Sequence, residues 1–424
     1  MYEFHPYFTN DGSVGLYSPD FDDIYHSSTG ALTEAYEKFI MPVNMDELLK
    51  KDEIKVLDIC YGIGYNSKSF LNFIFEKIFS HPINSIAPIH TNNNFATNNT
   101  IYNDKIYTDN IFNKISITAI DNDKILTFLS PFIKTGVKFF KNENFDFEKK
   151  NIGKYLEKNK RIKNQKINKI INFLIFEKIV QNYPDFLTNE AVTRIILDKK
   201  YAKYFTSDIR GIYRGKTIGG YITNLDRFLG GFLAFLHNIY YRHVANRYKK
   251  NLKRYKLDNV TFDLKIGDAR SVIKEDTNLY NLIFLDAFTP SKCPCLWSYE
   301  FFKLLYEHLE SDGMILTYST SAAIRSAMQE AGFYIGNVYN ERENKFTGTI
   351  ATKDKSLIKY PLSKFDLGLL KTSAGIFYRD ENLTGQNEAI FEARKIEVEN
   401  TDRISTSQYK KKFNKGEICK NTTS

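Results

Sequence analysis

Short apolar runs alternate with stretches of helical spacing along two parts of the chain. Runs bounded by polar or turn-forming residues predict buried strands at 54–59, 115–120, 260–266 and 281–285. Apolar side chains recur at helical spacing after the first run, from Phe70 to Ile78. They recur again after the last run, from Phe301 to Leu309, and Gly313 is expected to follow that helix. Strands that alternate with helices are typical of a parallel sheet covered on both faces.

The pattern continues toward the C-terminus. A run at 314–318 predicts another strand, and a helix over 322–331 is expected to stop at Gly332. The runs at 333–338 and 348–352 are close enough to pair as a hairpin. The sequence therefore predicts an α/β fold: a Rossmann-like, mostly parallel sheet with an antiparallel C-terminal hairpin.

The segments outside this alternation divide the chain. The predicted sheet domain occupies 51–135 and 216–385, and the stretch from Asp226 to Leu257 is expected to be the crossover helix that returns to the sheet. The other segments differ in composition: an N-terminal segment at 1–50 expected to cap the substrate, an Asn-rich loop at 81–112, a Lys- and Arg-rich helical insertion at 136–215, and a charged C-terminal tail at 386–424.

Composition changes this picture little. The net charge of +9 suits a polyanionic partner such as RNA, but a compositional bias toward Lys and a Lys-rich end of the chain explain it equally well. Cys293 and Cys295 lack the partners of a metal site, so no metal is expected. There is no signal-peptide pattern, and the most apolar helical stretch, 228–241, is too short for a membrane span. A cytoplasmic protein without a membrane partner is expected.

Acidic residues follow four of the predicted strands: Asp58, Asp121, Asp268 and Asp286. Carboxylates are costly to bury within a sheet, so they occur where a strand emerges into a cleft. In an open parallel sheet, ligands bind at that carboxyl edge, where the strand order reverses. The four acids are therefore predicted to surround one ligand pocket.

The loop after the first strand contains Gly62 and Gly64, followed by Asn66 at the start of a predicted helix. Glycines in such a loop allow the backbone to approach a ligand and leave N–H groups at the helix N-terminus. A dinucleotide fingerprint would need a third glycine where Ser67 stands. The loop therefore predicts a nucleotide-like cofactor other than a dinucleotide.

Two of the acids have specific expected roles in holding that cofactor. Asp121, at the end of the second strand, is placed to accept hydrogen bonds from both ribose hydroxyls, although it could equally cap the next helix. Asp268 is placed to accept an adenine amino group, and Ala269 beside it leaves room for the ring. The alternative for Asp268 is an ordinary turn residue.

The segment from Asp286 to Trp297 carries a family resemblance. With the glycine loop, it resembles the methyltransferase domain of the bacterial tRNA 5-methylaminomethyl-2-thiouridine enzymes, the MnmC-like group. The family pattern D-x-F-x-P-x-K-x-P-x-x-W is matched by six residues: Asp286, Phe288, Pro290, Lys292, Pro294 and Trp297. Residues 21–25 (F-D-D-I-Y) and 374–381 also resemble segments of the family.

The resemblance implies a class I S-adenosyl-L-methionine methyltransferase that methylates the 5-aminomethyl group of the wobble uridine in the tRNA anticodon stem-loop. Asp286 would orient the amine and take its proton, and Phe288 would stack on the flipped-out base. Lys292 could meet a phosphate and Trp297 could stack, although a solvated lysine and a core tryptophan are the plainer interpretations. Tyr25 and Glu34 would close over the cofactor.

Two departures from the family pattern keep other interpretations open. Cys60 stands where the family usually has glycine, and no flavin-dependent oxidase domain is expected, since no G-x-G-x-x-G segment follows the methyltransferase pattern. The resemblance therefore implies methyl transfer alone. A polyamine-synthase type of aminopropyltransferase, or a non-catalytic RNA-binding protein with a degenerate cleft, remains an alternative.

Overall fold

The computed structural model describes residues 2–19, 22–25, 30–80, 114–135, 160–218, 229–254 and 259–414. The predicted Asn-rich loop at 81–112 lies outside these residues, as do Phe21 and the last ten residues of the predicted tail.

A central sheet has the strand order β6-β5-β4-β7-β8-β10-β9. β4, β5, β6, β7 and β8 pair in parallel, and β10 runs antiparallel to both β8 and β9. This arrangement confirms the predicted fold class. The strands are β4 (Glu53–Ile59), β5 (Lys114–Asp121), β6 (Val260–Ile266), β7 (Tyr280–Leu285), β8 (Leu309–Thr317), β9 (Tyr334–Asn340) and β10 (Lys345–Thr352).

The strand order reverses between β4 and β7, because the chain runs outward from β4 to β6 and then returns to β7. Ile59 is in register with Leu285, and the Asp286 N–H donates to the Ile59 carbonyl at 3.3 Å. The loops after β4 and β7 therefore leave the sheet side by side, at the position where ligands bind in open α/β sheets.

Helices α10 (Ala269–Lys274), α11 (Tyr299–Glu307) and α12 (Ala322–Glu330) share a buried apolar cluster with the sheet. α12 ends before Gly332, whose φ of 103° is the left-handed conformation expected there. The expectation that Gly313 follows a helix is wrong. β8 begins at Leu309, and Gly313 lies inside that strand, where an added Cβ would come within 2.8 Å of the Tyr280 carbonyl oxygen.

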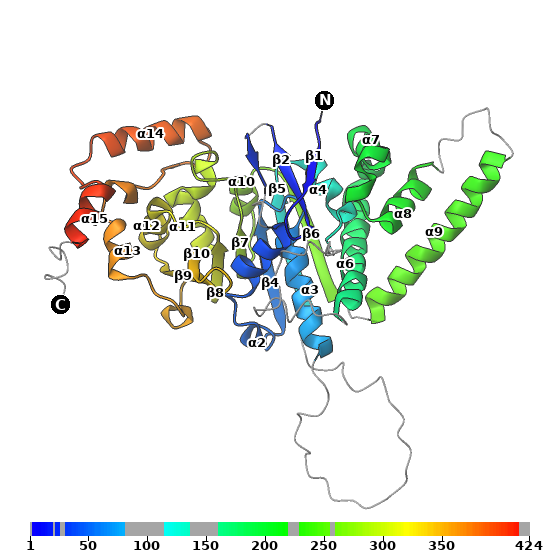
Figure 1. Cartoon of the computed structure of the whole chain (residues 1–424), viewed down its shortest axis with the longest axis horizontal. Helices are drawn as coiled ribbons and strands as arrows, with labels where there is room; N and C mark the ends of the chain where they lie inside the picture. Colours follow the sequence, from blue (N-terminus) through cyan, green and yellow to red (C-terminus); the bar gives the residue numbers. More distant parts are fainter. Residues whose placement is uncertain are drawn as a thin grey trace, which may run out of the picture.

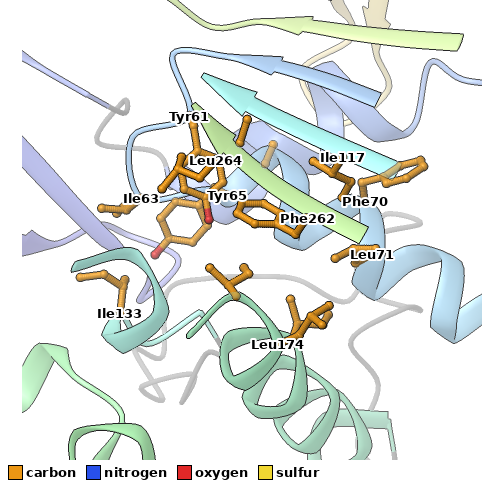
Figure 2. Packing of buried hydrophobic residues seen from close by; sticks show 14 of the residues in the cluster. Tyr61, Ile63, Tyr65, Phe70, Leu71, Ile117, Ile133, Leu174, Phe262 and Leu264 are labelled. Atoms are coloured by element: carbon orange, nitrogen blue, oxygen red, sulfur yellow. The ribbon is translucent and has the colours of Figure 1, made fainter. Parts of the chain in front are cut away.

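A second cluster joins the sheet to α3 (Tyr65–Ser80) and α6 (Lys160–Asn182). Figure 2 shows Leu174 of α6 facing the side chains of α3 and β6, Leu71 and Phe262 among them. The interpretation of 136–215 as an insertion separate from the sheet domain is therefore wrong for the described part, because α6 helps to cover the sheet.

Further helices follow α6: α7 (Glu190–Leu197), the 3-10 helix η6 (Lys199–Tyr204), α8 (Ser207–Ile218) and α9 (Leu229–Arg254). α9 packs chiefly on α8 and α6 and lies at one end of the molecule (Figure 1). The helix predicted over 226–257 is thus present as α9, but it packs chiefly on other helices rather than on the sheet. We refer to α6–α9 as the helical subdomain.

The strands of the N-terminal segment lie at the carboxyl edge of the sheet, and its last helix lies at the opposite edge, beside the start of β4 (Figure 1). The segment comprises β1 (His5–Phe8), β2 (Val14–Ser18), β3 (Asp23–Ile24), α1 (Ala31–Ala35), the π-helix η1 (Tyr36–Ile40) and α2 (Met45–Leu48). The Val14 N–H donates to the Tyr65 hydroxyl at 2.8 Å, which ties this segment to the start of α3.

The C-terminal segment is folded rather than a loose charged tail. It forms α13 (Lys364–Leu369), α14 (Asn387–Glu399) and α15 (Thr406–Asn414), and it buries Ile390 and Tyr409. α14 packs against the short 3-10 helix η8 (Pro294–Trp297). No described helix is both long and apolar enough to cross a membrane.

Replacing Leu174 with alanine should destabilise the whole protein by about 2–5 kcal/mol, because it leaves a cavity between α6 and the sheet. The same change at Leu367, which is 41% exposed, should alter stability by less than about 0.5 kcal/mol. Denaturant unfolding followed by circular dichroism measures both. A Leu174→Ala protein as stable as the wild type would show that α6 is dispensable to the core.

Candidate active site

A cavity of about 420 Å³ opens at the carboxyl edge of the sheet, beneath the N-terminal segment. Its wall includes seven residues predicted from the sequence: Tyr25, Glu34, Asp121, Asp268, Ala269, Asp286 and Phe288. Three of the four strand-end acids therefore converge on one pocket. The loops after β4, β5, β6 and β7 all contribute to it.

Asp121, at the end of β5, is organised by backbone donors. The Gly62 N–H donates to Oδ2 at 2.7 Å, and the Asp123 N–H donates to Oδ1 at 2.8 Å. Burial raises the pKa of the Asp121 carboxyl to about 6, while these N–H groups oppose the rise. Asp121 thus fixes the glycine loop and presents a carboxylate to the cavity. The cap of α4 (Lys124–Leu129) is Asp123, so the alternative role for Asp121 does not apply.

The glycine loop takes three left-handed residues in five positions, with φ of 63° at Cys60, 54° at Gly62 and 79° at Gly64. Cys60 therefore occupies a conformation that glycine adopts without strain, and its side chain lines the cavity. Gly64 serves packing rather than ligand approach, because an added Cβ would lie 2.3 Å from the Tyr61 ring. A Cβ added at Gly62 would meet no clash, since the nearest atoms belong to Tyr25 at 3.8 Å and the Cys60 carbonyl at 4.0 Å, and neither loop glycine lines the cavity.

Asp58 does not line the cavity, which corrects its predicted role as a direct cofactor ligand. Its side chain is fully buried beneath the loop, where Oδ2 accepts from the Ser67 N–H at 3.1 Å and the Ser67 hydroxyl at 2.5 Å. Oδ1 has no hydrogen-bond partner, and burial raises the Asp58 pKa to about 8. Asp58 holds the start of α3.

Asp286 is held by Asn66, whose side-chain amide donates to Oδ2 at 3.0 Å. Asn66 is therefore a positioning residue and does not itself line the cavity. Burial, and then the charge of Glu34, raise the pKa of Asp286 to about 7, while the Asn66 bond lowers it. Glu34 forms an ion pair with Lys38 on the next turn of the chain.

The loop from Asp286 to Trp297 holds an aromatic pair at the cavity wall. The rings of Phe288 and Tyr25 lie 4.9 Å apart with a tilt of 60°. The Trp297 indole N–H donates to the Phe288 carbonyl at 2.8 Å, and its side chain is 0% exposed. A stacking role for Trp297 is therefore wrong. Trp297 fixes the backbone of Phe288 instead, while Lys292 is exposed outside the cavity.

Asp268 lines the cavity but already has a cationic partner. Arg270 donates to both Asp268 oxygens, at 3.1 Å from Nε to each and at 2.6 Å from Nη2 to Oδ2, and donates from Nη1 to Asp380 at 2.6 Å. Burial raises the pKa of Asp268, but the Arg270 bonds outweigh it and lower the pKa below its usual range. Asp268 also caps α10. It can accept an adenine amino group only through its remaining lone pairs.

Sequence reasoning missed Arg270, Tyr318 and Asn387, which also line the cavity. Tyr318 directly follows β8, but the predicted strand at 314–318 included it, so the strand-end rule did not select it. Its hydroxyl donates to the Ala287 carbonyl at 2.9 Å. Asn387 begins α14 inside the predicted tail, and its side-chain oxygen accepts from the Cys295 N–H at 3.2 Å. The predicted domain boundary at 385 therefore cuts through the cavity wall.

The charge of the cavity fits a cationic ligand. Its lining includes five carboxylates, those of Asp23, Glu34, Asp121, Asp268 and Asp286, and the guanidinium of Arg270. A positive sulfonium gains from such a surface, and the small residues Gly267, Ala269 and Ala287 leave room for a flat ring. The described residues contain no group of three or more Cys, His, Asp or Glu side chains arranged for a metal ion.

Comparisons with known proteins agree with this chemistry. Residues 233–354 match the family model described as S-adenosyl-L-methionine-dependent methyltransferase. The structure resembles the crystal structure of MnmC2 from Aquifex aeolicus, with a TM-score of 0.53, 18% sequence identity, and coverage of 95% of this chain and 87% of that one. The matched segment is thus similar to S-adenosyl-L-methionine-dependent methyltransferases, and the structural likeness shows that this chain shares the fold of MnmC2.

Two known proteins are similar to parts of this chain in sequence. An uncharacterised protein of Methanocaldococcus jannaschii is 32% identical over 167 residues, which are 37% of this chain and 46% of that protein. A protein of Campylobacter hominis named tRNA 5-methylaminomethyl-2-thiouridine biosynthesis bifunctional protein MnmC is 35% identical over 77 residues, 18% of this chain and 12% of that protein. The similarity to the second relative agrees with the predicted resemblance to the MnmC-like group, and the chain spans less than half the length of either relative.

Replacing Asp121 with asparagine should weaken S-adenosyl-L-methionine binding by about 10–100-fold, because a charged hydrogen-bond acceptor in a buried wall is lost. Isothermal titration calorimetry measures the affinity. Asp312→Asn, at an exposed surface ion pair, is the matched control and should bind like the wild type. Unchanged affinity in Asp121→Asn would remove Asp121 from the cofactor site.

Proposed function

We propose that this protein methylates the 5-aminomethyl group of the wobble uridine in tRNA, with S-adenosyl-L-methionine as methyl donor. The observation that carries the proposal is Asp286, a cavity carboxylate at the point where the strand order reverses, two residues before an aromatic side chain in the same wall. Such a pairing suits a substrate that is at once an amine and a flat base.

Asp121, Gly62 and Ala269 would hold the cofactor. Asp121 offers carboxylate oxygens for the ribose, the Gly62 N–H holds that carboxylate in place, and Ala269 provides room beside the ring. When bound, S-adenosyl-L-methionine supplies a methyl group on a positively charged sulfur. The surrounding carboxylates would stabilise the positive charge that the amine nitrogen acquires when it takes the methyl group.

Asp286 would bind the amine and take its proton. An aminomethyl group is largely an ammonium ion in water, and it must be neutral to attack a methyl carbon. A carboxylate whose pKa is raised to about 7 is a stronger base than an ordinary aspartate, so it accepts that proton more readily. Glu34 also lines the cavity and carries a negative charge close enough to raise the pKa of Asp286, so it adds attraction for the incoming cation.

Phe288 would stack on the base. Its ring is partly exposed and lines the cavity. The Tyr25 ring packs against it, and the Trp297 indole N–H donates to its backbone carbonyl. Unpaired RNA bases commonly stack on aromatic side chains, and enzymes that act on a base take it out of its stack. A braced ring costs less entropy on stacking than a mobile one.

The deciding experiment uses purified protein, S-adenosyl-L-methionine and tRNA that carries 5-aminomethyluridine or its 2-thio form. Nucleoside mass spectrometry should detect a gain of one methyl group on that uridine. Unmodified tRNA is the matched control and should gain none. Parallel reactions with decarboxylated cofactor and putrescine test aminopropyl transfer. Product there, and none on tRNA, would overturn the proposal.

Replacing Asp286 with asparagine should reduce methyl transfer at least about 1,000-fold, because the group that takes the proton is lost. Cofactor affinity should stay within about tenfold of the wild type, since the change is nearly isosteric. Single-turnover kinetics and calorimetry measure the two quantities separately. A wild-type rate would exclude Asp286 as the base.

The pH profile of kcat/KM should rise through about pH 7, because Asp286 must be ionised to accept a proton. Asn66→Ala removes a bond that lowers the Asp286 pKa, so its midpoint should move to higher pH. Asn72→Ala is the control. Asn72 lies on the same helix as Asn66, but its side chain donates to the Tyr36 hydroxyl of η1. A shift to lower pH in Asn66→Ala would contradict this assignment.

A further inference from the structure

The positive charge of the chain is concentrated in the helical subdomain. Residues 160–254 contain 20 Lys and Arg against six Asp and Glu, a net charge of +14, whereas the whole chain carries +9. The rest of the chain therefore sums to −5. A general bias toward lysine would spread the excess along the chain, so it does not account for this separation.

The subdomain is linked to the cavity wall through α7, although none of its described residues lines the cavity. Arg194 of α7 donates to the Tyr2 carbonyl at 3.0 Å, and the Tyr2 hydroxyl donates to Asp123 at 2.7 Å. The Asp123 N–H in turn donates to Asp121 in the cavity wall. Three contacts thus connect a surface cation to the proposed cofactor site.

Four exposed cations lie on α7 and η6, and we call them the rim patch: Arg194, Lys199, Lys200 and Lys203. η6 is held against the N-terminal segment by aromatic contacts of 5.2 Å between Tyr201 and Phe4 and 4.8 Å between Tyr204 and Phe8. Lys200 and Lys203 lie over these tyrosine rings, at 4.6 Å and 5.0 Å. The rim patch is therefore built on a packed element beside the cavity.

α9 extends the cationic surface to the end of the molecule (Figure 1). Its sequence has no acidic residue, and it presents Arg242, Arg247 and Lys250 to solvent while Val244 and Tyr248 are buried. Nearby, Glu177 of α6 pairs with Lys216 and Lys249. A stripe of cations along one helix is the electrostatic pattern of nucleic-acid binding.

We propose that the rim patch and the exposed face of α9 bind the phosphate backbone of the RNA whose base enters the cavity. This inference rests on the proposed function and adds where the RNA lies. The cavity is lined by acids, so an anionic polymer is repelled there and attracted by the helical subdomain. Phosphate contacts of this kind fix the register of a nucleic acid while the pocket selects the base. α7 and η6 lie outside the segment matched by the methyltransferase family model.

The test replaces the rim patch with glutamine, as Arg194→Gln/Lys199→Gln/Lys200→Gln/Lys203→Gln. KM for aminomethylated tRNA should rise at least ~10-fold, while kcat at saturating tRNA and cofactor affinity stay unchanged. The slope of log affinity against log salt should fall by ~3, because each lost phosphate contact contributes about 0.7–0.9. Arg242→Gln/Arg247→Gln/Lys250→Gln should give a smaller loss of the same kind.

The matched control is Lys364→Gln/Lys371→Gln/Lys410→Gln/Lys411→Gln, which removes the same charge from exposed lysines of the C-terminal segment at the opposite end (Figure 1). An equal rise in KM there would overturn the inference in favour of net charge alone. A wild-type KM and salt slope in a folded rim-patch variant would also overturn it, as would binding of anionic phosphatidylserine vesicles without binding of tRNA.

The two proposals fail separately. Absence of methyl transfer by the wild-type protein would refute the proposed function. In that case, filter binding of the same tRNA still tests where the RNA lies. Weaker binding by the rim-patch variant than by the control variant would support the surface, and equal binding would refute it.

Discussion

The pairing of β4 with β5 on one side and β7 on the other is the constraint on which the site depends. Parallel registry brings the ends of these strands to one edge, so Cys60, Asp121 and Asp286 meet although they are far apart in the sequence. The hydrogen bond from the Gly62 N–H to Asp121 then locks the first loop to the second strand. Without this registry the carboxylates would lie at unrelated positions.

Burial gives the acids at this edge different properties. Asp58, without a partner for Oδ1, lies beneath the loop, Asp121 is satisfied by backbone donors, and Asp268 is neutralised by Arg270. Asp286 combines burial, a like charge in Glu34 and a bond from Asn66. Residues of similar chemistry thus divide into a buried structural acid, an acid held by backbone donors in the cavity wall, a capping acid paired with arginine, and a cavity acid of raised pKa, because their surroundings differ.

Local patterns in the sequence were enough to predict most of the sheet. The predicted strands at 260–266 and 281–285 coincide with β6 and β7 to within one residue. β7 is buried along its whole length and gives an almost unbroken apolar run, whereas the edge strand β6 alternates buried and exposed residues. The strand-end rule also found Asp121, Asp268 and Asp286. Sequence position alone could not show that Asp58 faces away from the cavity.

What the sequence did not reveal depends on packing between distant segments. The Lys-rich composition of α6 hid a buried apolar face that covers the sheet, and the polar composition around Asn387 hid its place in the cavity wall. Trp297 matched a family motif, but no pattern could show that its indole is enclosed. These features arise from tertiary contacts and have no local signal.

Asn387 and Tyr25 come from near opposite ends of the chain, yet both belong to the wall of one cavity. The entropy of closing so long a loop must be overcome before either contact adds stability. The sheet can therefore assemble from its nearer neighbours first, and the pocket is completed only when both terminal segments dock. On a ribosome, the cavity would lack the part of its wall that Asn387 supplies until α14 had emerged.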